Sequence, residues 1–346
     1  MRFGWNSAAY QILNPDMEHW FAPDGDACVG FVRWAGVRVV AGAPICAEER
    51  LAEAAATFER EAAEAGETVC YFGAAERLHR VLAGLPGHSV VPIGAQPGWR
   101  PANWAAILAR TRSLRAQLNR ARNKGVSAAE RDPHVAAEDW ALQQCFDQWK
   151  DGHAGLSLHF LTEPVPLDRL KDRRVFVAER AGAPVGFLVA TPVPERRGWL
   201  VEQIVRGTGA PNGTAELLID ALMRAAAAEE SEFVTLGLAP LSQRAGAAPG
   251  PRLWLRFLLD WVRAHGARFY NFEGLDAFKA KFQPDAWEPI FAISNEPHFS
   301  VRTLYGVAAA FTHGAPMAAI ARAVTSAVRQ EWQWLRDPPP REKPAA

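Results

Sequence analysis

The sequence contains little cysteine, no excess charge and no long apolar run, and each absence narrows the class of protein. Its 346 residues include four cysteines, and 38 basic residues balance 38 acidic ones. The cysteines form no CxxC pair, which argues against a zinc site, and their apolar neighbours predict buried free thiols in a reducing compartment. Without net charge, contact with nucleic acid or an anionic surface requires a local basic patch.

Other absences exclude whole function classes. No run of about 18 apolar residues is present, and the N-terminus lacks the apolar core of a signal peptide, so the sequence predicts a cytoplasmic protein. It has no P-loop, no GxGxxG dinucleotide motif and no GxSxG nucleophile elbow. These absences disfavour nucleotide hydrolysis, hydride transfer and serine hydrolase chemistry. We expect neither a metal nor a cofactor.

What is present is an alternation of strands and helices that predicts an α/β (α+β) protein. In the first half we expect strands within 26–42, a helix over 47–65, a strand over 68–72, a helix over 76–82, a strand over 88–93 and a loop around 97–101. In the second half we expect a helix over 138–150, strands over 174–179, 185–191 and 199–206, a helix over 214–229, a strand over 232–236, a helix over 252–265 and strands over 268–272 and 289–294. This order resembles that of the acetyl-CoA-dependent N-acetyltransferases. We therefore predict tandem GNAT-like lobes, each a mixed, mostly antiparallel sheet flanked by helices.

The predicted domains follow from this order. Residues 1–130 are expected to form the first lobe, ending in a basic helix, and residues 131–298 the second lobe with the candidate active site. The polar stretch 127–138 is expected to link the lobes. Residues 299–346 are expected to form a helical tail with a disordered end. The apolar spacing of the tail favours packing against the body, and a helix lying on a bilayer surface is the alternative.

A basic run without acidic residues occupies residues 110–124. Arg112, Arg115 and Arg122 fall at helical spacing on one face, and guanidinium groups bind phosphate oxygens in pairs. The run therefore predicts contact with a phosphodiester backbone. The alternative is a solvated helix whose charge is balanced by acids from another segment.

A glycine-rich loop, 207–213, follows Arg206 and precedes a predicted helix. Glycines at a helix N-terminus expose backbone N–H groups and favour an anion. Coenzyme A binds at this position in acetyltransferases, but Pro211 removes a backbone donor and argues against it. The alternative is a tight turn that needs glycine.

Polar residues also follow the predicted strand 268–272. Asn271 and Glu273 would point to the same side of a strand, and Lys279 and Lys281 could neutralise a phosphate or an oxyanion. The alternative for the lysines is the start of a surface helix. Among the scattered histidines, His159 is the one we keep as a candidate.

Four stretches together resemble a known family. They are SLRAQLNRARNKG (113–125), APNGTAELLIDALM (210–223), LGLAPLS (236–242) and YNFEGLDAFKAKFQPDAW (270–287). In this order and spacing they resemble the C-terminal catalytic domain of the phosphatidylglycerol lysyl- and alanyltransferases, the multiple peptide resistance factor family. The resemblance implies tandem acetyltransferase-like lobes that move an amino acid from aminoacyl-tRNA to the hydroxyl of a phosphatidylglycerol-like lipid.

The resemblance also implies roles for individual residues. Arg206 and Lys281 would stabilise the oxyanion of the tetrahedral intermediate or hold the terminal phosphate of the tRNA. Glu202, Glu273 or His159 would assist proton transfer or bind the amino group. The expected catalytic residues are Arg206, Lys281, Glu273 and Glu202; the expected substrate-binding residues are His159, Gln203, Asn212, Gly213, Asn271 and Lys279; the expected tRNA-binding residues are Arg112, Arg115, Asn119, Arg122 and Lys124.

Two departures from the family pattern bear on the acceptor. The family's lipid enzymes carry a large N-terminal membrane domain that this sequence does not contain, and Gln203 stands where the family carries aspartate in D-L-M-R. Two alternatives therefore stay open: aminoacylation of a small soluble acceptor, and acetyl-CoA-dependent N-acetylation, which Pro211 disfavours. The expected partners are aminoacyl-tRNA and an anionic phospholipid or small-molecule acceptor, with peripheral contact at the inner face of the membrane and no DNA. The amino acid and the oligomeric state are not predicted.

Overall fold

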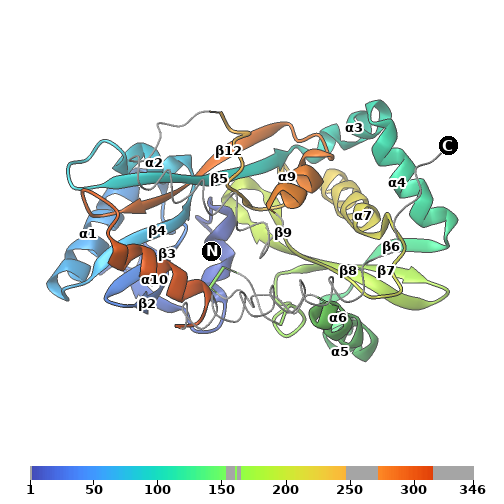
Figure 1. Cartoon of the computed structure of the whole chain (residues 1–346), viewed down its shortest axis with the longest axis horizontal. Coiled ribbons are helices and arrows are strands. Elements are labelled where there is room, and N and C mark those ends of the chain that lie inside the picture. The colour runs from blue at the N-terminus through green and yellow to red at the C-terminus, as the bar shows by residue number, and fades with distance from the viewer. Residues whose placement is uncertain (1, 153–159, 162–164, 247–271, 315–346) are drawn as a thin grey trace, which may run out of the picture.

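The computed structural model describes residues 2–152, 160–161, 165–246 and 272–314. The helix expected over 252–265, most of the strand expected over 268–272, His159, Asn271 and the tail beyond 314 lie outside these residues. Within the described ranges the chain forms one continuous 12-stranded sheet with helices packed on it (Figure 1).

The strand order is β1-β2-β3-β4-β12-β5-β10-β9-β8-β7-β6, with β11 paired to β5. The strands are β1 (Glu18–Phe21), β2 (Cys28–Trp34), β3 (Val37–Ala41), β4 (Thr68–Ala74), β5 (Ser89–Trp99), β6 (Val126–Arg131), β7 (Arg174–Arg180), β8 (Ala183–Val193), β9 (Gly198–Arg206), β10 (Phe233–Thr235), β11 (Ala239–Pro240) and β12 (Ala286–Ser294). Among the described strands, β3–β4 and β9–β10 pair in parallel and the other pairs are antiparallel. The expected fold class, a mostly antiparallel mixed sheet flanked by helices, is confirmed. We call β1–β5 with β12 the first half-sheet and β6–β10 the second half-sheet.

Each half-sheet contains a parallel pair joined by a helix, β3-α1-β4 and β9-α7-β10, because parallel neighbours need a crossover connection. The helices are η1 (Ser7–Leu13), η2 (Glu48–Arg50), α1 (Leu51–Glu64), α2 (Glu76–Leu82), η3 (Pro101–Asn103), α3 (Trp104–Arg110), α4 (Arg112–Asn123), α5 (Pro133–Glu138), α6 (Trp140–Gly152), η4 (Pro194–Arg196), α7 (Thr214–Ala228), α9 (Phe272–Ala280) and α10 (Val301–Phe311). Helix α1 buries Phe58 in one core, and α7 buries Leu218 and Leu222 in another.

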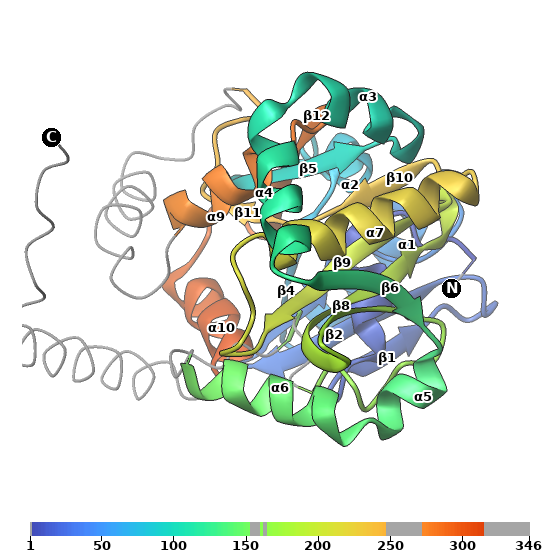
Figure 2. The same cartoon turned by 90° about the vertical axis from the view of Figure 1, so that its right-hand side faces the viewer.

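The second half-sheet is buried on both faces. Phe176 and Leu188 belong to the core that α4 and α7 cover, whereas Val177 and Phe187 belong to the core that α6 covers. This alternation is the period of two that a strand requires. Figure 2 shows α4 and α7 on one face of these strands and α6 on the other.

Strand β5 is longer than the sequence predicts. The expected loop at Pro97 and Gly98 is wrong, because these residues pair with Trp287 and Ala286 of β12. Proline normally interrupts an inner strand, since it offers no backbone donor. Here β12, which is distant in the sequence, runs antiparallel along β5, and β10 pairs with the end of β5 on its other side. Because β12 lies between β4 and β5, the end of the expected second lobe joins the first half-sheet, and the domain boundaries stay a prediction.

The expected linker over 127–138 is also wrong. Strand β6 is the edge of the second half-sheet and pairs with β7, and Asp132 caps α5 by accepting from the backbone N–H of His134 at 2.8 Å. The polar composition that suggests a linker belongs to an edge strand, where alternate side chains meet solvent.

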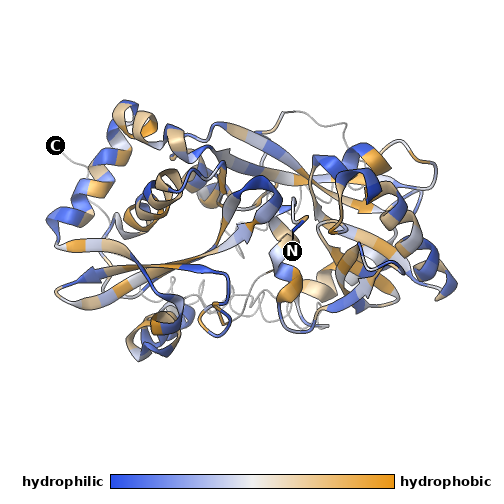
Figure 3. Cartoon of the chain, turned by 180° about the vertical axis from the view of Figure 1, so that it is seen from behind, coloured by the Kyte–Doolittle hydropathy of each residue, from blue (hydrophilic) through white to orange (hydrophobic). Residues whose placement is uncertain are grey.

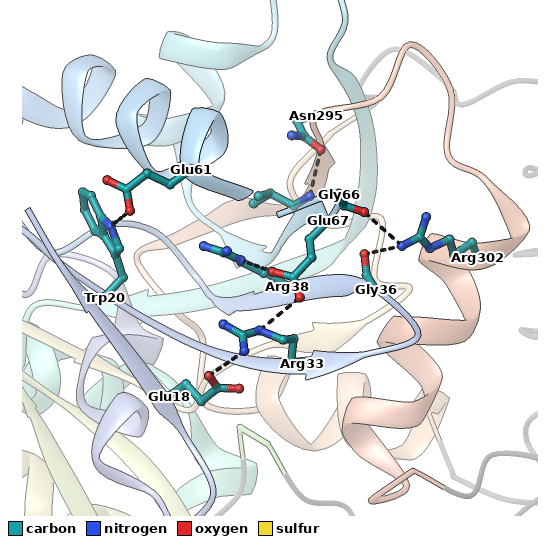
Figure 4. Close-up of polar contacts among 11 residues, drawn as sticks. Glu18, Trp20, Arg33, Gly36, Arg38, Glu61, Gly66, Glu67, Asn295 and Arg302 are labelled. Atoms are coloured by element: carbon teal, nitrogen blue, oxygen red, sulfur yellow. Dashed lines mark hydrogen bonds and ion pairs between the residues drawn. The ribbon is translucent and has the colours of Figure 1, made fainter. Parts of the chain in front are cut away.

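Helix α10 docks on the first half-sheet. Arg302 donates to the carbonyl oxygens of Ala35 and Gly36 at 2.7 and 2.8 Å, in the tight turn between β2 and β3. Figure 4 shows the contact with Gly36. Beside this turn, Glu67 accepts from Arg38 at 2.6 Å and pairs with Arg33 at 3.1 Å. These contacts join α10 and the β2–β3 hairpin into one unit.

The two half-sheets also meet at Trp5. The guanidinium of Arg77, on α2, lies 3.4 Å from the ring centroid of Trp5, and that of Arg196, on η4, lies 4.8 Å from it. Arg77 also pairs with Glu195 at 2.7 Å. Desolvated contacts of this kind stabilise by about 1–2 kcal/mol each and hold the half-sheets at one angle.

Helix η1 lies between the half-sheets and contacts β2, β3 and β8. Ile12 approaches β2 so closely that a Cβ on Gly30 would lie 2.4 Å from the Ile12 Cβ. We expect Gly30→Ala to lower the free energy of unfolding by about 1–3 kcal/mol through overpacking, measured by urea denaturation. Gly84→Ala is the matched control, because nothing lies within 4 Å of its Cβ position. Equal stability of the two variants would contradict this packing.

Candidate functional site

The two parallel strand pairs differ at their carboxyl ends, where open α/β sheets bind ligands. Strands β3 and β4 stay paired from Val37↔Thr68 to Ala41↔Phe72. Strands β9 and β10 pair only from Gly198↔Phe233 to Leu200↔Thr235, and β9 continues to Arg206 without β10 beside it. The parallel strands of the second half-sheet therefore separate towards their carboxyl ends, whereas those of the first half-sheet stay paired.

The N-terminal segment fills the corresponding place in the first half-sheet. Asn6 donates to the carbonyl oxygen of Gly73 at 2.9 Å, and its side chain lies against Gly42 at the end of β3. The cavity left between these residues and α2 is about 20 Å³, room for a single water molecule. The candidate site therefore lies in the second half-sheet.

A β-bulge marks this site. The pairing of β8 with β9 passes from Val189↔Gln203 to Ala190↔Val201, so β9 carries one extra residue here, Glu202. Bulges commonly redirect side chains next to active sites. Two consecutive polar residues, Glu202 and Gln203, in an otherwise apolar strand are the sequence signal for it.

Glu202 is a buried carboxylate held from two sides. Its side chain is 3% exposed, Arg173 Nε lies 3.3 Å from Oε2, and Gln11 Nε2 donates to Oε1 at 3.3 Å. A buried ion pair is stable only when further hydrogen bonds serve its remaining atoms. Sequence reasoning missed Gln11 and Arg173, because both come from segments far from β9 in the chain.

Tyr10 holds the loop that carries Arg173. Its hydroxyl donates to the carbonyl oxygen of Lys171 at 2.8 Å, and its ring lies beside the Arg173 guanidinium. Burial, and then the nearby Asp172 carboxylate, raise the pKa of Tyr10 to about 12. The hydroxyl therefore stays protonated and acts as a donor near neutral pH.

The site contains hydrogen-bond acceptors that have no donor. Gln11 Oε1 and Gln203 Oε1 are buried and accept no hydrogen bond from the residues that the structure describes. Because buried polar atoms are nearly always paired, these oxygens need a donor that the described residues do not supply, such as a water molecule or a ligand.

The four stretches that carry the family resemblance contact one another. Gly213 has φ +97°, and a Cβ there would lie 2.2 Å from the carbonyl oxygen of Gln117, so this glycine lets α7 start against α4. Lys281 Nζ binds Glu216 Oε1 at 2.7 Å, at the start of α7. Asn212 is exposed in the same loop. The structure therefore brings Gly213, Glu216 and Lys281 together, and the turn alone explains the glycine.

Lys279 is buried and holds the loop that follows β10. Its Nζ donates to the carbonyl oxygens of Gly237 and Leu238 at 2.9 and 2.7 Å, while Asp276 accepts from Ser242 Oγ at 2.6 Å. Desolvation lowers the pKa of Lys279 to about 7, and the charge of Asp276 opposes this shift. Its predicted contact with substrate stays a prediction.

The other expected residues are distributed over the surface. Arg206 is exposed at the end of β9 and makes no ion pair within the part of the chain that the structure describes. Glu273 is exposed on α9, so the expected strand continuation at 272–273 is wrong: these residues begin a helix. His159 and Asn271 lie outside the described residues.

Two arginines of the basic helix have internal partners. Arg115 donates to the carbonyl oxygens of Leu108 and Ala109 and so caps α3. Arg122 pairs at 2.8 Å with Asp220, a buried carboxylate that also accepts from Trp104. Arg110, Arg112, Asn119, Arg120 and Lys124 are exposed and make no such contact with the residues that the structure describes. In Figure 3 much of the α4 ribbon carries the blue colour of hydrophilic residues.

Comparison with known proteins identifies the family. The sequence model described as phosphatidylglycerol lysyltransferase, C-terminal, matches residues 2–294. The chain belongs to this family. It is 26% identical over 325 residues to the lysylphosphatidylglycerol biosynthesis bifunctional protein LysX of Gordonia bronchialis, covering 89% of this chain and 27% of that protein. It is 24% identical over 323 residues to LysX of Mycobacterium tuberculosis, covering 89% and 26%. The chain thus spans about a quarter of the length of these relatives.

Solved structures show the same fold. The C-terminal domain of a putative lysylphosphatidylglycerol synthetase from Agrobacterium fabrum superposes with a TM-score of 0.74 at 22% identity, covering 89% of this chain and 93% of that one. L-PGS from Bacillus licheniformis superposes with a TM-score of 0.69 at 20% identity and the same coverage.

The described residues contain no helix long and apolar enough to cross a bilayer, and no cluster of three or more His, Cys, Asp or Glu side chains placed to hold a metal. The four cysteines are free, as the sequence predicts, and three of them are buried.

The depressed pKa of Lys279 predicts how stability depends on pH. Between pH 7 and about 10 the unfolded lysine keeps a proton that the folded one has lost, so stability rises with pH. We expect the unfolding free energy of the wild type relative to Lys279→Met to increase from pH 7 to pH 9, by at most about 1.4 kcal/mol per unit. Urea denaturation at several pH values measures this difference in unfolding free energy. The contributions of titratable groups present in both proteins cancel in the difference. A pH-independent difference would refute a neutral, buried Lys279.

Proposed function

We propose that this chain moves an aminoacyl group from aminoacyl-tRNA to the hydroxyl of an anionic phospholipid of the phosphatidylglycerol type. The observation that carries the proposal is the family match over residues 2–294. The opening of the sheet beside β9 supports it, because it puts a buried carboxylate and unpaired acceptors where open sheets bind ligands.

The chemistry of this site fits an amine-bearing acyl group. The ammonium of an aminoacyl ester offers three N–H donors, and Gln11 Oε1 and Gln203 Oε1 offer acceptors that lack a donor. Glu202 adds a buried negative charge, with Arg173 Nε 3.3 Å from its Oε2. An acetyl group has no N–H or O–H donor to offer these oxygens. The two glutamine acceptors therefore favour aminoacyl transfer over acetyl transfer.

The transfer itself needs positioning and charge stabilisation. The acceptor oxygen attacks the aminoacyl carbonyl carbon, its proton passes to a base, and the bond to the ribose oxygen of the tRNA breaks as that oxygen gains a proton. Because the tRNA ester is already activated, no nucleotide is consumed. In this proposal Arg206, at the end of β9, stabilises the oxyanion, with Lys281 near the start of α7. Glu202 receives the amino group, and Glu273 is a candidate for the proton transfer.

A transfer assay tests the donor and the acceptor together. The protein is incubated with radiolabelled aminoacyl-tRNAs and phosphatidylglycerol vesicles, and we expect label to enter the organic phase. Label that moves only into water-soluble products would indicate a small acceptor. Transfer from radiolabelled acetyl-CoA instead would contradict the proposal.

Within this assay, Arg206→Ala should reduce kcat/KM at least about tenfold, a loss of about 1.4 kcal/mol of transition-state stabilisation. Arg197→Ala is the matched control, because Arg197 forms only an exposed pair with Glu232. Unchanged turnover in a folded Arg206→Ala protein would remove this residue from the site.

The basic helix is proposed to contact the tRNA through the arginines that have no internal partner. Arg112→Glu combined with Arg120→Glu should weaken tRNA binding and reduce its salt dependence by about one to two units of log–log slope. Arg80→Glu, an exposed change on the first half-sheet, is the control. The contact would be excluded by an unchanged affinity and slope. The variants avoid Arg115 and Arg122, whose loss would also destabilise the fold.

A further inference from the structure

We propose that η1, at the N-terminal end of the chain, completes the site of the second half-sheet, and that Gln11 is a positioning residue for Glu202. The inference rests on the proposed function, because Glu202 is there taken to bind the amino group of the donor. It assigns to the site a residue that lies far from β9 in the sequence and belongs to the segment preceding the first half-sheet.

One side of η1 is anchored to the first half-sheet. Asn6 caps the helix by accepting from the backbone N–H of Ala8 at 2.8 Å and also donates to Gly73. Ile12 packs against Gly30, and its carbonyl oxygen lies 2.8 Å from His19 Nε2 on β1. These contacts tie this side of η1 to the first half-sheet.

The other side of η1 reaches the loop before β7 and strand β9. Tyr10 donates to Lys171, and Arg169 Nη1 donates to the carbonyl oxygen of Leu13 at 2.9 Å. Between these two contacts, Gln11 is 1% exposed and donates to Glu202. Gln11 is deeply buried, and its amide nitrogen donates to the Glu202 carboxylate at the bulge. Its amide oxygen has no donor among the described residues. We infer that η1, rather than local packing alone, determines the position of this side chain.

Glutamine suits this position because it is neutral and has both a donor and an acceptor. Its amide nitrogen fixes one oxygen of Glu202 while Arg173 lies beside the other, so the carboxylate has a single orientation. Its amide oxygen stays available for a ligand donor. A glutamate here would keep the shape but place two carboxylates side by side in a buried site, which raises the pKa of the pair.

The test compares Gln11→Glu, Gln11→Ala and Glu202→Gln in the transfer assay across pH 5.5 to 8.5, beside thermal unfolding. Leu13→Ala is the matched control, since that side chain lies on the same helix and is 44% exposed. We expect Gln11→Glu to move the acidic limb of the kcat/KM profile upward by about one pH unit. We expect Gln11→Ala to lower transfer about tenfold, and Leu13→Ala to match the wild type.

A double-mutant cycle tests the contact independently of catalysis. Gln11→Ala and Glu202→Ala should shift the melting temperature non-additively, because each removes one partner of the same hydrogen bond. Additive shifts together with an unmoved pH profile in Gln11→Glu would overturn the inference. Full activity of Glu202→Gln would also overturn it, while leaving aminoacyl transfer standing. A wild-type protein that moves no label would instead refute the proposed function, before any variant is compared.

Discussion

The structure depends on the pairing of β5 with β12. This pair joins the two half-sheets, since β5 carries β12 on one side and β10 with β11 on the other. The pairing closes a long loop in the chain and therefore costs conformational entropy that only a large buried area can offset. The β5–β12 pairing also fixes the geometry of the site. The ends of β9 and β10, the start of α7 and the N-terminal segment take fixed positions relative to one another. Trp5, held between Arg77 and Arg196, reinforces the same arrangement.

The half-sheets repeat one unit, but the chain uses them differently. In the first, the parallel pair stays closed and Asn6 occupies the space beside its end. In the second, β10 leaves β9 after three paired positions and a bulge presents Glu202. The first half-sheet thus acts as a support, and its N-terminal segment provides side chains to the second. Buried polar groups, among them Gln11, Arg173 and Glu202, contact one another where the two meet. Burying such groups is costly in desolvation free energy, and they are often found at binding sites.

Several residues that look functional in the sequence have structural partners. Lys279 holds Gly237 and Leu238, Arg115 caps α3, and Gly213 permits the approach of Gln117. The contacts of Lys279 and Gly213 join stretches that resemble the family. The resemblance is therefore carried by residues that hold the structure together as well as by candidate reacting groups. Arg206 and the arginines of α4 that have no internal partner among the described residues are exposed, and their contact with phosphate or developing charge stays a prediction.

The sequence by itself determined the elements that local chemistry specifies. The hairpin turn at Ala35-Gly36, the helices α1, α4 and α7, and the alternating strands β7 to β9 follow from periodicity, glycine positions and capping, which act over a few residues. Through the family resemblance it also named Glu202 as an expected catalytic residue and Gln203 as an expected substrate-binding residue. Only the tertiary structure decided that Pro97 lies in a strand, that β12 enters the first half-sheet, and that Gln11 and Arg173 meet Glu202. Those contacts join residues far apart in the chain, and no local pattern encodes which distant partner will satisfy a strand edge or a buried charge.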